Sequence, residues 1–251
     1  MGFIKRLFTF FIIVILLGIL AYYYPNFTGE SVKDSGSGYE KEPAFFTRAI
    51  DGDTIEVEIN GNKEKIRLLG INTLEKGMPY SKKATEFLKT FEGKDVELLR
   101  DNEDFDRYER KLRYLFYGGN LINAEILQEG LATSFMIDGL SYQKNLEDAE
   151  DFARKSKIGI WKESSEKCAE CIKLKELNAE IEYFIIENRC DFNCNLTGWF
   201  VKDDANHFFY LNNLDSNKAK NYNSEIEVWN DGGDRFFMRD DRGDLVIFYE
   251  Y

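Results

Sequence analysis

One turn, flanked by alternating charged and apolar residues, constrains the fold of this chain more than any other feature of its sequence. Residues 49–76 read AIDGDTIEVEINGNKEKIRLLGINTLEK, and this alternation is typical of strands that bury one face. Asn60-Gly61 is the strongest short-range signal for a two-residue hairpin turn. Such a turn predicts three cross-strand pairs: Glu58 with Lys63, Glu56 with Lys65, and Thr54 with Arg67. The stretch therefore predicts an antiparallel hairpin with one face in a core.

Side chains with ligand oxygens and one guanidinium group lie at the open end of this hairpin. Asp51 and Asp53 precede the first strand, and the pairing of Thr54 with Arg67 makes Arg67 a near neighbour of Asp53. The residues after the second strand add further oxygen atoms, from Asn72, Thr73 and Glu75. Carboxylate and amide oxygens are potential metal ligands, and a guanidinium binds phosphate oxygens through paired hydrogen bonds. Taken alone, the same residues also fit an ordinary polar edge with solvated charges.

Helix and strand patterns alternate after the hairpin. An acidic loop over residues 101–111 separates two expected strands. Helices are expected over residues 84–91, 124–129 and 146–153, and strands over residues 96–100 and 112–117. About five strands with three helices predict a mainly β fold with α, a small barrel of the oligonucleotide-binding (OB) type.

Composition limits the number of domains and the kind of ligand. With 251 residues, of which 43% are hydrophobic, the chain can bury the cores of two ordinary domains. Its net charge of −12 excludes a general nucleic-acid coat, because binding along the phosphate backbone needs a basic surface. A local cationic site that works with a metal ion is still compatible with this charge.

The N-terminal segment has the composition of a membrane anchor. Lys5 and Arg6 precede an uncharged run, residues 7–24, that is long enough for a short membrane-spanning helix. The basic pair directs the rest of the chain outward, so we expect a single-pass protein of the cell membrane, anchored by residues 1–24, with extracytoplasmic domains. A cleaved signal peptide is the alternative, although no small-residue cleavage site follows the run. Residues 25–42 are expected to form a flexible tether.

The C-terminal third has the pattern of a second, all-β domain. Five short apolar runs, separated by Asn, Asp and Gly, predict an antiparallel sandwich. These runs are residues 181–187, 199–202, 207–211, 235–238 and 245–249. His207, the only histidine, is expected to be a strand residue, because it lacks the partners of a metal site. Arg242-Gly243-Asp244 is expected to form a hairpin turn and not an adhesion motif.

Four cysteines mark the junction between the two expected domains. Their spacings, C-x2-C and C-x3-C, fit a zinc site of four thiolates. A hairpin over residues 172–189 instead places Cys171 almost opposite Cys190, with Cys168 and Cys194 just beyond. An extracytoplasmic location favours oxidation, so we prefer two disulfides, Cys171–Cys190 and Cys168–Cys194, over zinc and over free thiols.

Five sequence blocks occur in the order and at the spacing of a known family: AIDGDTIEV, RLLGINTLE, DRYERKLRYLFY, LINAEILQEGLA and GIW. Through these blocks, residues 44–161 resemble the staphylococcal nuclease (thermonuclease) family. The resemblance implies a domain over residues 43–163, built as a five-stranded OB barrel with three helices. It also implies the hydrolysis of DNA and RNA phosphodiester bonds with calcium.

The same resemblance implies roles for individual residues. Arg67 and Arg110 occupy the positions of the family's two catalytic arginines, and Glu75 occupies that of the carboxylate that activates or orients water. Tyr108 falls where the family has a tyrosine beside the bound nucleotide. The metal ligands that the resemblance implies are Asp53, Asn72 and the backbone carbonyl of Thr73.

Several positions depart from the family pattern. Asn72 replaces an aspartate, Leu74 a proline, Glu109 a glycine, and Met136 and Asp138 two tyrosines. Asn72 keeps an oxygen but loses a charge, so we expect weaker calcium binding than at a site with two aspartates. Because the two tyrosines are replaced by Met136 and Asp138, a nucleotide base has no aromatic ring to stack on at these positions.

The second domain resembles a different family. The blocks IKLKELN, EYFIIENRC, NLTGWFVKDD, DGGDRFFM and DRGDLVIFYEY resemble a lamin-tail domain. This resemblance implies an immunoglobulin-like β-sandwich over residues 168–251 that binds or anchors, with an unknown ligand.

These features together predict a membrane-anchored, extracytoplasmic nuclease that is monomeric. It would be a calcium-dependent phosphodiesterase, an endonuclease acting on DNA, RNA or both. The alternatives are a non-catalytic nucleic-acid or surface-binding protein that uses the OB barrel as a platform, and a structural adhesin that acts through its tail domain. The presence of Arg67, Glu75 and Arg110 together favours the enzyme, because a binding groove has little use for a carboxylate beside phosphate.

Overall fold

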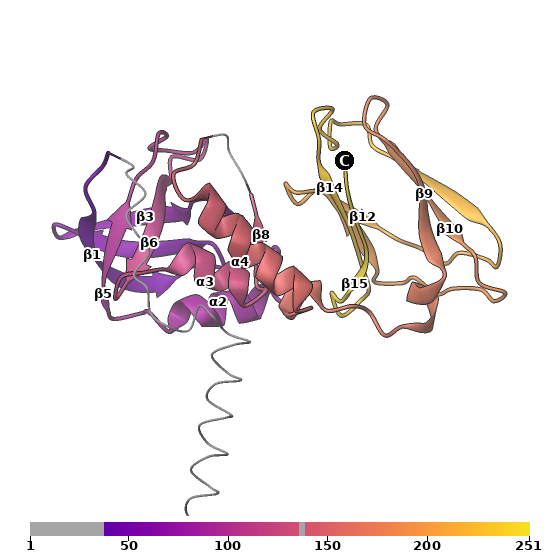
Figure 1. The fold of residues 1–251 in the computed structure, drawn as a ribbon, viewed down its shortest axis with the longest axis horizontal. Coiled ribbons are helices and arrows are strands. Elements are labelled where there is room, and N and C mark those ends of the chain that lie inside the picture. Colours follow the sequence, from indigo (N-terminus) through magenta and orange to yellow (C-terminus); the bar gives the residue numbers. More distant parts are fainter. Residues whose placement is uncertain (1–37, 136–138) are drawn as a thin grey trace, which may run out of the picture. The chain divides into compact units, whose positions relative to one another are not determined.

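The structure, a computed structural model, describes residues 38–135 and 139–251 (Figure 1). The expected membrane anchor, residues 1–24, and most of the expected tether lie outside these residues. Within the described ranges, no helix is long and apolar enough to cross a membrane.

Five strands of the N-terminal half close into a barrel. They are β1 (Glu42–Ala49), β2 (Thr54–Ile59), β3 (Asn62–Leu68), β5 (Asp95–Leu99) and β6 (Lys111–Tyr117). Their order is β3-β2-β1-β5-β6, and parallel pairing of β3 with β6 closes the barrel. A two-residue strand, β7 (Asn120–Leu121), pairs with the outer side of β6. The predicted five-stranded barrel is therefore present.

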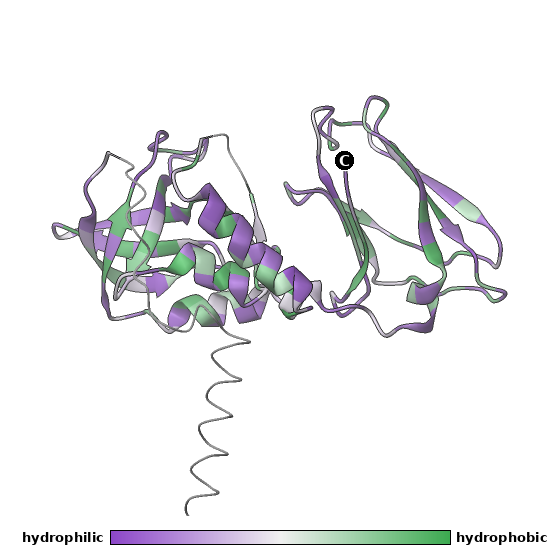
Figure 2. Ribbon diagram, in the orientation of Figure 1, coloured by the Kyte–Doolittle hydropathy of each residue, from purple (hydrophilic) through white to green (hydrophobic). Residues whose placement is uncertain are grey.

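Strands β2 and β3 form the predicted hairpin. Asn60 and Gly61 lie in the turn with φ angles of 51° and 80°, the left-handed conformation that a two-residue turn requires. The three expected cross-strand pairs are confirmed: Glu58–Lys63, Glu56–Lys65 and Thr54–Arg67. Figure 2 shows the hydrophobic residues concentrated along the barrel strands, where Ile55, Val57 and Ile66 have no exposed surface.

Within residues 38–135 and 139–163, three α-helices accompany the barrel, as predicted. They are α2 (Ser81–Lys89), α3 (Ile122–Gln128) and α4 (Gln143–Lys155), and a 3-10 helix, Gly159–Trp161, follows α4. Figure 2 shows many hydrophilic residues along α4, while its Leu146 and Ala153 are fully buried. Two short strands, β4 (Ile71–Asn72) and β8 (Thr133–Ser134), pair with each other and connect the open end of the hairpin to the segment before α4.

The C-terminal half consists of two antiparallel sheets around one apolar core. One sheet has the order β13-β10-β9, with β9 (Ile172–Asn178), β10 (Tyr183–Asn188) and β13 (Ala219–Asn223). The other has the order β12-β11-β14-β15, with β11 (Phe200–Lys202), β12 (Phe208–Tyr210), β14 (Arg235–Arg239) and β15 (Leu245–Glu250). Phe184, Trp229 and Phe236 lie at the centre of the core. This arrangement agrees with the predicted sandwich.

Two details of the second half differ from the prediction. Strand β13, with the sequence AKNYN, has no counterpart among the predicted strands, because its alternation lacks an apolar side. His207 lies immediately before β12 and not in a strand. Its Nδ1 is 2.7 Å from Oδ2 of Asp203, so the histidine is part of a loop contact.

The cysteines form the two predicted disulfides. Cys168 is bonded to Cys194, with Cα atoms 5.8 Å apart, and Cys171 to Cys190, with Cα atoms 5.3 Å apart. The alternatives of a zinc site and of free thiols are therefore wrong, because all four sulfur atoms are in covalent pairs. The pairs hold the start of β9 to the segment after β10.

A shared apolar cluster joins the two halves. Leu74, Ala153 and Trp161 of the N-terminal half pack with Phe200 and Phe237 of the C-terminal half. The turn between β14 and β15 also contacts the barrel side, because Tyr80 donates a hydrogen bond to Asp244 Oδ1 at 3.0 Å. The Arg-Gly-Asp tripeptide is thus the predicted hairpin turn, and its Asp244 is buried against Tyr80.

Candidate functional site

The Asp-Gly-Asp turn before β2 is closed by its first aspartate. Oδ1 of Asp51 accepts hydrogen bonds from the backbone N–H groups of Asp53, at 3.1 Å, and Thr54, at 2.8 Å. A Cβ atom on Gly52 would lie 2.7 Å from both Cβ of Ala84 and Oγ1 of Thr73. Only glycine fits at this close approach, which brings Asp53 against Thr73.

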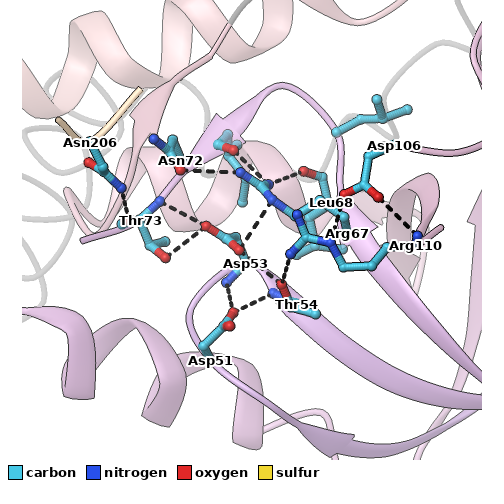
Figure 3. A network of polar contacts seen from close by, with 12 residues as sticks. Asp51, Asp53, Thr54, Arg67, Leu68, Asn72, Thr73, Asp106, Arg110 and Asn206 are labelled. Carbon is cyan, nitrogen blue, oxygen red and sulfur yellow. Dashed lines mark hydrogen bonds and ion pairs between the residues drawn. The ribbon is translucent and has the colours of Figure 1, made fainter. Parts of the chain in front are cut away.

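Asp53 is the centre of a buried polar network (Figure 3). Its Oδ2 accepts hydrogen bonds from the N–H and the hydroxyl of Thr73, at 3.0 and 2.9 Å. Its Oδ1 accepts one from the hydroxyl of Thr54 at 3.1 Å and lies 3.3 Å from Nε of Arg67. Asp53 is only 8% exposed, so the predicted ion pair with Arg67 forms in a weakly screened place.

Negative charge accumulates on the acidic side of this network. Burial raises the pKa of Asp51, and the nearby carboxylate of Asp53 raises it further, against hydrogen bonds from the turn that lower it. Two carboxylates in one partly buried turn favour a bound cation, since a cation offsets their repulsion.

Arg67 is held mainly by backbone carbonyls. Nη1 donates to the carbonyls of Leu68 and Ile71 at 2.7 and 2.8 Å, and Nη2 donates to Oδ1 of Asn72 at 3.2 Å. Nε adds an ion pair with Asp53, so every nitrogen of the guanidinium contacts the protein. Among the hydrogen bonds of the described residues, one of the two N–H groups of Nη2 is left for a ligand.

Arg110 reaches the same network from the loop before β6. Nε donates to Oδ2 of Asp106 at 2.7 Å, and Nη1 donates to the hydroxyl of Thr54 at 3.1 Å. Burial alone would raise the pKa of Asp106, but hydrogen bonds from the backbone and side chain of Arg110 outweigh it, and the pKa is lowered. Thr54 thus links Arg110 to Asp53 and Arg67, and Figure 3 shows both guanidinium groups at this end of the hairpin.

Tyr108 lies at the outer side of Arg110. It is 62% exposed, and the guanidinium carbons of Arg107 and Arg110 lie 4.8 and 5.5 Å from its ring centroid. Glu109, between them, has a φ of 60°, in the left-handed region. Glycine adopts this conformation without strain, which explains why the family pattern has glycine at this position.

The end of β4 and the residues that follow it contact the second half of the protein. Nδ2 of Asn72 donates to the carbonyl of Asp204 at 2.8 Å, and the carbonyl of Thr73 accepts from Nδ2 of Asn206 at 2.8 Å. Glu75 is exposed, with Oε1 3.5 Å from the same Asn206 nitrogen. The two predicted ligands, Asn72 and Thr73, are therefore both in contact with the loop between β11 and β12.

The donor atoms fit calcium by type. Among the described residues, no group of three or more His, Cys, Asp or Glu side chains lies close enough to hold a metal ion. The oxygen atoms at the site are the Asp53 carboxylate, the Thr73 carbonyl and the Glu75 carboxylate, which are hard ligands of the kind that Ca²⁺ takes. A further oxygen, Oδ1 of Asn206, is buried and accepts no hydrogen bond from the described residues, while Nδ2 of the same amide contacts the Thr73 carbonyl. Turned about its bond, this amide would present an oxygen to the carbonyl and the nearby Glu75 carboxylate, and three such oxygens fit a cation.

The structure therefore brings most of the predicted site residues together. Asp53, Arg67, Asn72, Thr73 and Arg110 are in one network, and Glu75 lies at its edge through Asn206. Met136 and Asp138 lie outside the described residues.

Sequence reasoning missed two side chains that position this site. Asp106 orients Arg110, and the Asp-x-x-x-Arg spacing within DRYER is a local signal that could have indicated the pair. Asn206 lies 133 positions after Thr73 in the chain, and no local pattern connects it to the site.

A separate cleft of about 480 Å³ lies between α4 and the C-terminal half. Its lining holds two arginines, Arg154 and Arg235, and six acidic residues: Glu147, Glu150, Asp151, Asp204, Asp234 and Glu250. Both arginines are paired with carboxylates of the same lining, so the cleft is acidic overall and the hairpin end is the better place for an anionic ligand.

Comparisons with known proteins show which family the N-terminal half resembles. The family described as "Staphylococcal nuclease homologue" matches residues 65–163. The chain is 33% identical over 158 residues to a thermonuclease of Staphylococcus intermedius, and the match covers 60% of this chain and 94% of that protein. It is 34% identical over 138 residues to a thermonuclease of Staphylococcus hyicus, across 51% of this chain and 82% of the relative. A third relative, "Staphylococcal-like nuclease CAN1" of Arabidopsis thaliana, is 36% identical over 111 residues, across 43% of this chain and 32% of the relative.

Proposed function

The chain belongs to the staphylococcal nuclease family, and on this premise we propose that it is a calcium-dependent nuclease that hydrolyses phosphodiester bonds of DNA, RNA or both. The observation that carries the proposal is the network at the open end of the β2–β3 hairpin. It places Arg67 and Arg110 on either side of Thr54, with the exposed carboxylate of Glu75 at the edge. This end of the hairpin thus offers two guanidinium groups that can bind a phosphate and a carboxylate that can act as a base toward water.

The two arginines would stabilise the charge that develops on the phosphate. Phosphodiester hydrolysis adds negative charge to the oxygen atoms of the phosphate, and guanidinium groups bind such oxygens strongly. Asp106 and Thr54 hold Arg110, while backbone carbonyls and Asp53 hold Arg67. Because both side chains are held in advance, little reorganisation is needed when the substrate binds.

Glu75 would orient the attacking water and take its proton. Its side chain is exposed, so a water molecule can reach it from solvent. A carboxylate in hydrogen-bond reach of water acts as a general base. Asp53 and the Thr73 carbonyl would hold Ca²⁺, which supplies positive charge beside the phosphate when it is bound.

A cleavage assay tests the proposal. The purified full-length chain is incubated with single-stranded and double-stranded DNA and RNA, in calcium and in chelator. We expect cleavage of at least one substrate with calcium and loss of cleavage with chelator. Equal cleavage in chelator would remove calcium from the proposal, and binding without any cleavage would favour the non-catalytic OB platform.

We propose further that the enzyme is a monomer anchored in the cell membrane with its domains outside. Lys5-Arg6 before the uncharged run supports this topology, and the two disulfides are typical of an oxidising compartment. The C-terminal sandwich would be a lamin-tail-like binding or anchoring domain. Protease added to intact cells should remove both domains, and protection of the domains would contradict the outward topology.

A further inference from the structure

The loop between β11 and β12, residues 203–207, reaches the proposed calcium site from the second domain. Asn206 donates from Nδ2 to the carbonyl of Thr73 at 2.8 Å, and the same nitrogen lies 3.5 Å from Oε1 of Glu75. Figure 3 shows Asn206 directed at Thr73, on the side of the network away from Arg110. A residue of the sandwich therefore contacts two groups of the nuclease site.

The loop is held firmly against the barrel side. Nε of Arg235 lies 2.8 Å from both carboxylate oxygens of Asp204, and its Nη1 lies 2.8 Å from Oε2 of Glu150 on α4. Asp203 accepts the backbone N–H of His207 at 2.7 Å, which closes the loop. The position of Asn206 is thus set by contacts to both halves of the protein.

The amide of Asn206 is only half satisfied. Its Oδ1 is buried and has no hydrogen-bond partner in the part of the chain that the structure describes, while its Nδ2 contacts the Thr73 carbonyl. A half-turn of the amide exchanges the two atoms, which have nearly the same shape. The oxygen would then take the place of the nitrogen, beside the Thr73 carbonyl and the Glu75 carboxylate. Neighbouring oxygen ligands of one Ca²⁺, each bound at about 2.3–2.6 Å, lie roughly 3 Å apart, which fits this place.

Asn72 is less well placed for the same task. Its Oδ1 accepts a hydrogen bond from Arg67, and its Nδ2 donates to Asp204, so both ends of its amide are engaged. The site lacks the second carboxylate of the family pattern, and Asn206 can present its oxygen there once the amide is turned, because that oxygen accepts no hydrogen bond from the described residues.

We propose that Asn206 is a calcium ligand supplied by the second domain, so that the metal site is complete only when the sandwich is docked on the barrel. The inference rests on the proposed calcium-dependent nuclease and names an additional residue of its metal site. It makes the sandwich a part of the catalytic unit as well as a binding or anchoring module.

Two substitutions at Asn206 test the proposal by calcium binding alone. Asn206 has a φ of 65°, which glycine adopts freely and aspartate tolerates, so both variants keep the backbone. Calcium is titrated calorimetrically into the full-length chain without nucleic acid. We expect Asn206→Gly to weaken binding at least about 5-fold, and Asn206→Asp to strengthen it, because a carboxylate binds calcium better than an amide.

Asn217 offers a matched control. It also has a left-handed φ, 55°, and it is exposed in the loop before β13. Asn217→Gly and Asn217→Asp make the same changes in backbone and charge, and we expect both to bind calcium like the wild type.

The outcomes separate this inference from the proposed function. Unchanged or tighter binding in Asn206→Gly would overturn the inference, since the amide would then be irrelevant or would block the site. Weaker binding in Asn206→Asp would also overturn it, because the amide would act only as a donor to Thr73. If the wild type binds no calcium, Asn206 is not a calcium ligand. A cleavage assay on the same preparation then still tests whether the protein is a nuclease. If Asn206 governs calcium binding but no nucleic acid is cut, the inference stands and the proposed function fails.

Discussion

Asn72 departs from the family pattern because it has a second partner in this protein. Its oxygen accepts a hydrogen bond from Arg67, as a carboxylate could, but its nitrogen donates to the carbonyl of Asp204 in the second domain. Leu74, another departure, packs in the apolar cluster with Phe200 and Phe237. Both departures lie where the barrel meets the sandwich, so the interface accounts for them.

Asn72→Asp should therefore lower the stability of the protein and add a negative charge to the proposed calcium site. The variant loses the donor to Asp204 and sets two oxygens against each other, which should lower the free energy of unfolding by about 1–3 kcal/mol. It also adds a carboxylate near Asp53, so the calcium concentration for half-maximal cleavage should fall. Urea denaturation and calcium-dependent rates measure the two effects. Unchanged stability would contradict the role of Asn72 in the interface.

Lys202 should give the second domain a stability that depends on pH. It is 2% exposed, with Nζ 4.6 Å from the ring centroid of Phe237, and burial lowers its pKa from the ordinary 10.5 to about 7. Between these values the unfolded chain binds a proton that the folded chain has released, so stability rises with pH.

We expect this dependence to disappear in Lys202→Met. The unfolding free energy of wild type should increase relative to the variant by up to about 1.4 kcal/mol per pH unit between about pH 7 and 10. Denaturation of both proteins across this range measures the difference. A difference that does not change with pH would show that Lys202 keeps its ordinary pKa.

At the scale of elements, the hairpin and the loop before β6 build the site together. The β2–β3 hairpin carries Asp53 and Arg67, and the loop carries Asp106 and Arg110. Thr54 at the start of β2 connects them through one hydroxyl. The loop depends on Asp106, which accepts hydrogen bonds from the backbone of Tyr108 and from Arg110.

Asp106→Asn should loosen Arg110 without unfolding the barrel. The amide keeps the shape of the carboxylate but loses the charge that pairs with Nε, so Arg110 becomes a less well-placed partner for phosphate. We expect a fall in kcat of about 10-fold or more with a small change in Tm. Arg110→Lys serves as a comparison, since it keeps the charge and loses the planar group. A variant with wild-type kcat would show that Asp106 does not position Arg110.

Local signals made part of this architecture predictable from the sequence. Asn60-Gly61 sets the register of the hairpin, and the register places Arg67 beside Asp53. The expected β9–β10 hairpin likewise gave the cysteine pairing. Strand β13 was not predictable, because Tyr222 is the only residue of AKNYN that packs against the core. The role of Asn206 was not predictable either, because it depends on how the two domains dock.

At the scale of the whole molecule, the two domains share one interface that includes the site. An apolar cluster lies beside a charged group in which Arg235 contacts Asp204 and Glu150. Burial would lower the pKa of Arg235, but the two carboxylates outweigh it and raise the pKa, so the guanidinium stays charged. The ion pairs hold the loop that carries Asn206 against the nuclease domain.

Arg235→Leu should lower both the stability of the domain interface and the affinity for calcium. Removing one partner of a buried ion pair leaves carboxylates without compensation, which typically costs about 3–5 kcal/mol. We expect a lower free energy of unfolding and, from the role of Asn206, weaker calcium binding. Calorimetry and denaturation of the same preparation measure both. Loss of stability with unchanged calcium affinity would contradict the dependence of the metal site on the docked domain.

The most direct test of the nuclease assignment is the cleavage rate of Glu75→Gln at saturating calcium. Glu75 is exposed, so the substitution should leave Tm unchanged, while the lost base should lower kcat by about 100-fold or more. Arg67→Ala is a poorer probe, because Arg67 also bonds to backbone carbonyls and its loss should affect folding. A folded Glu75→Gln variant that cuts DNA or RNA at the wild-type rate would contradict the account.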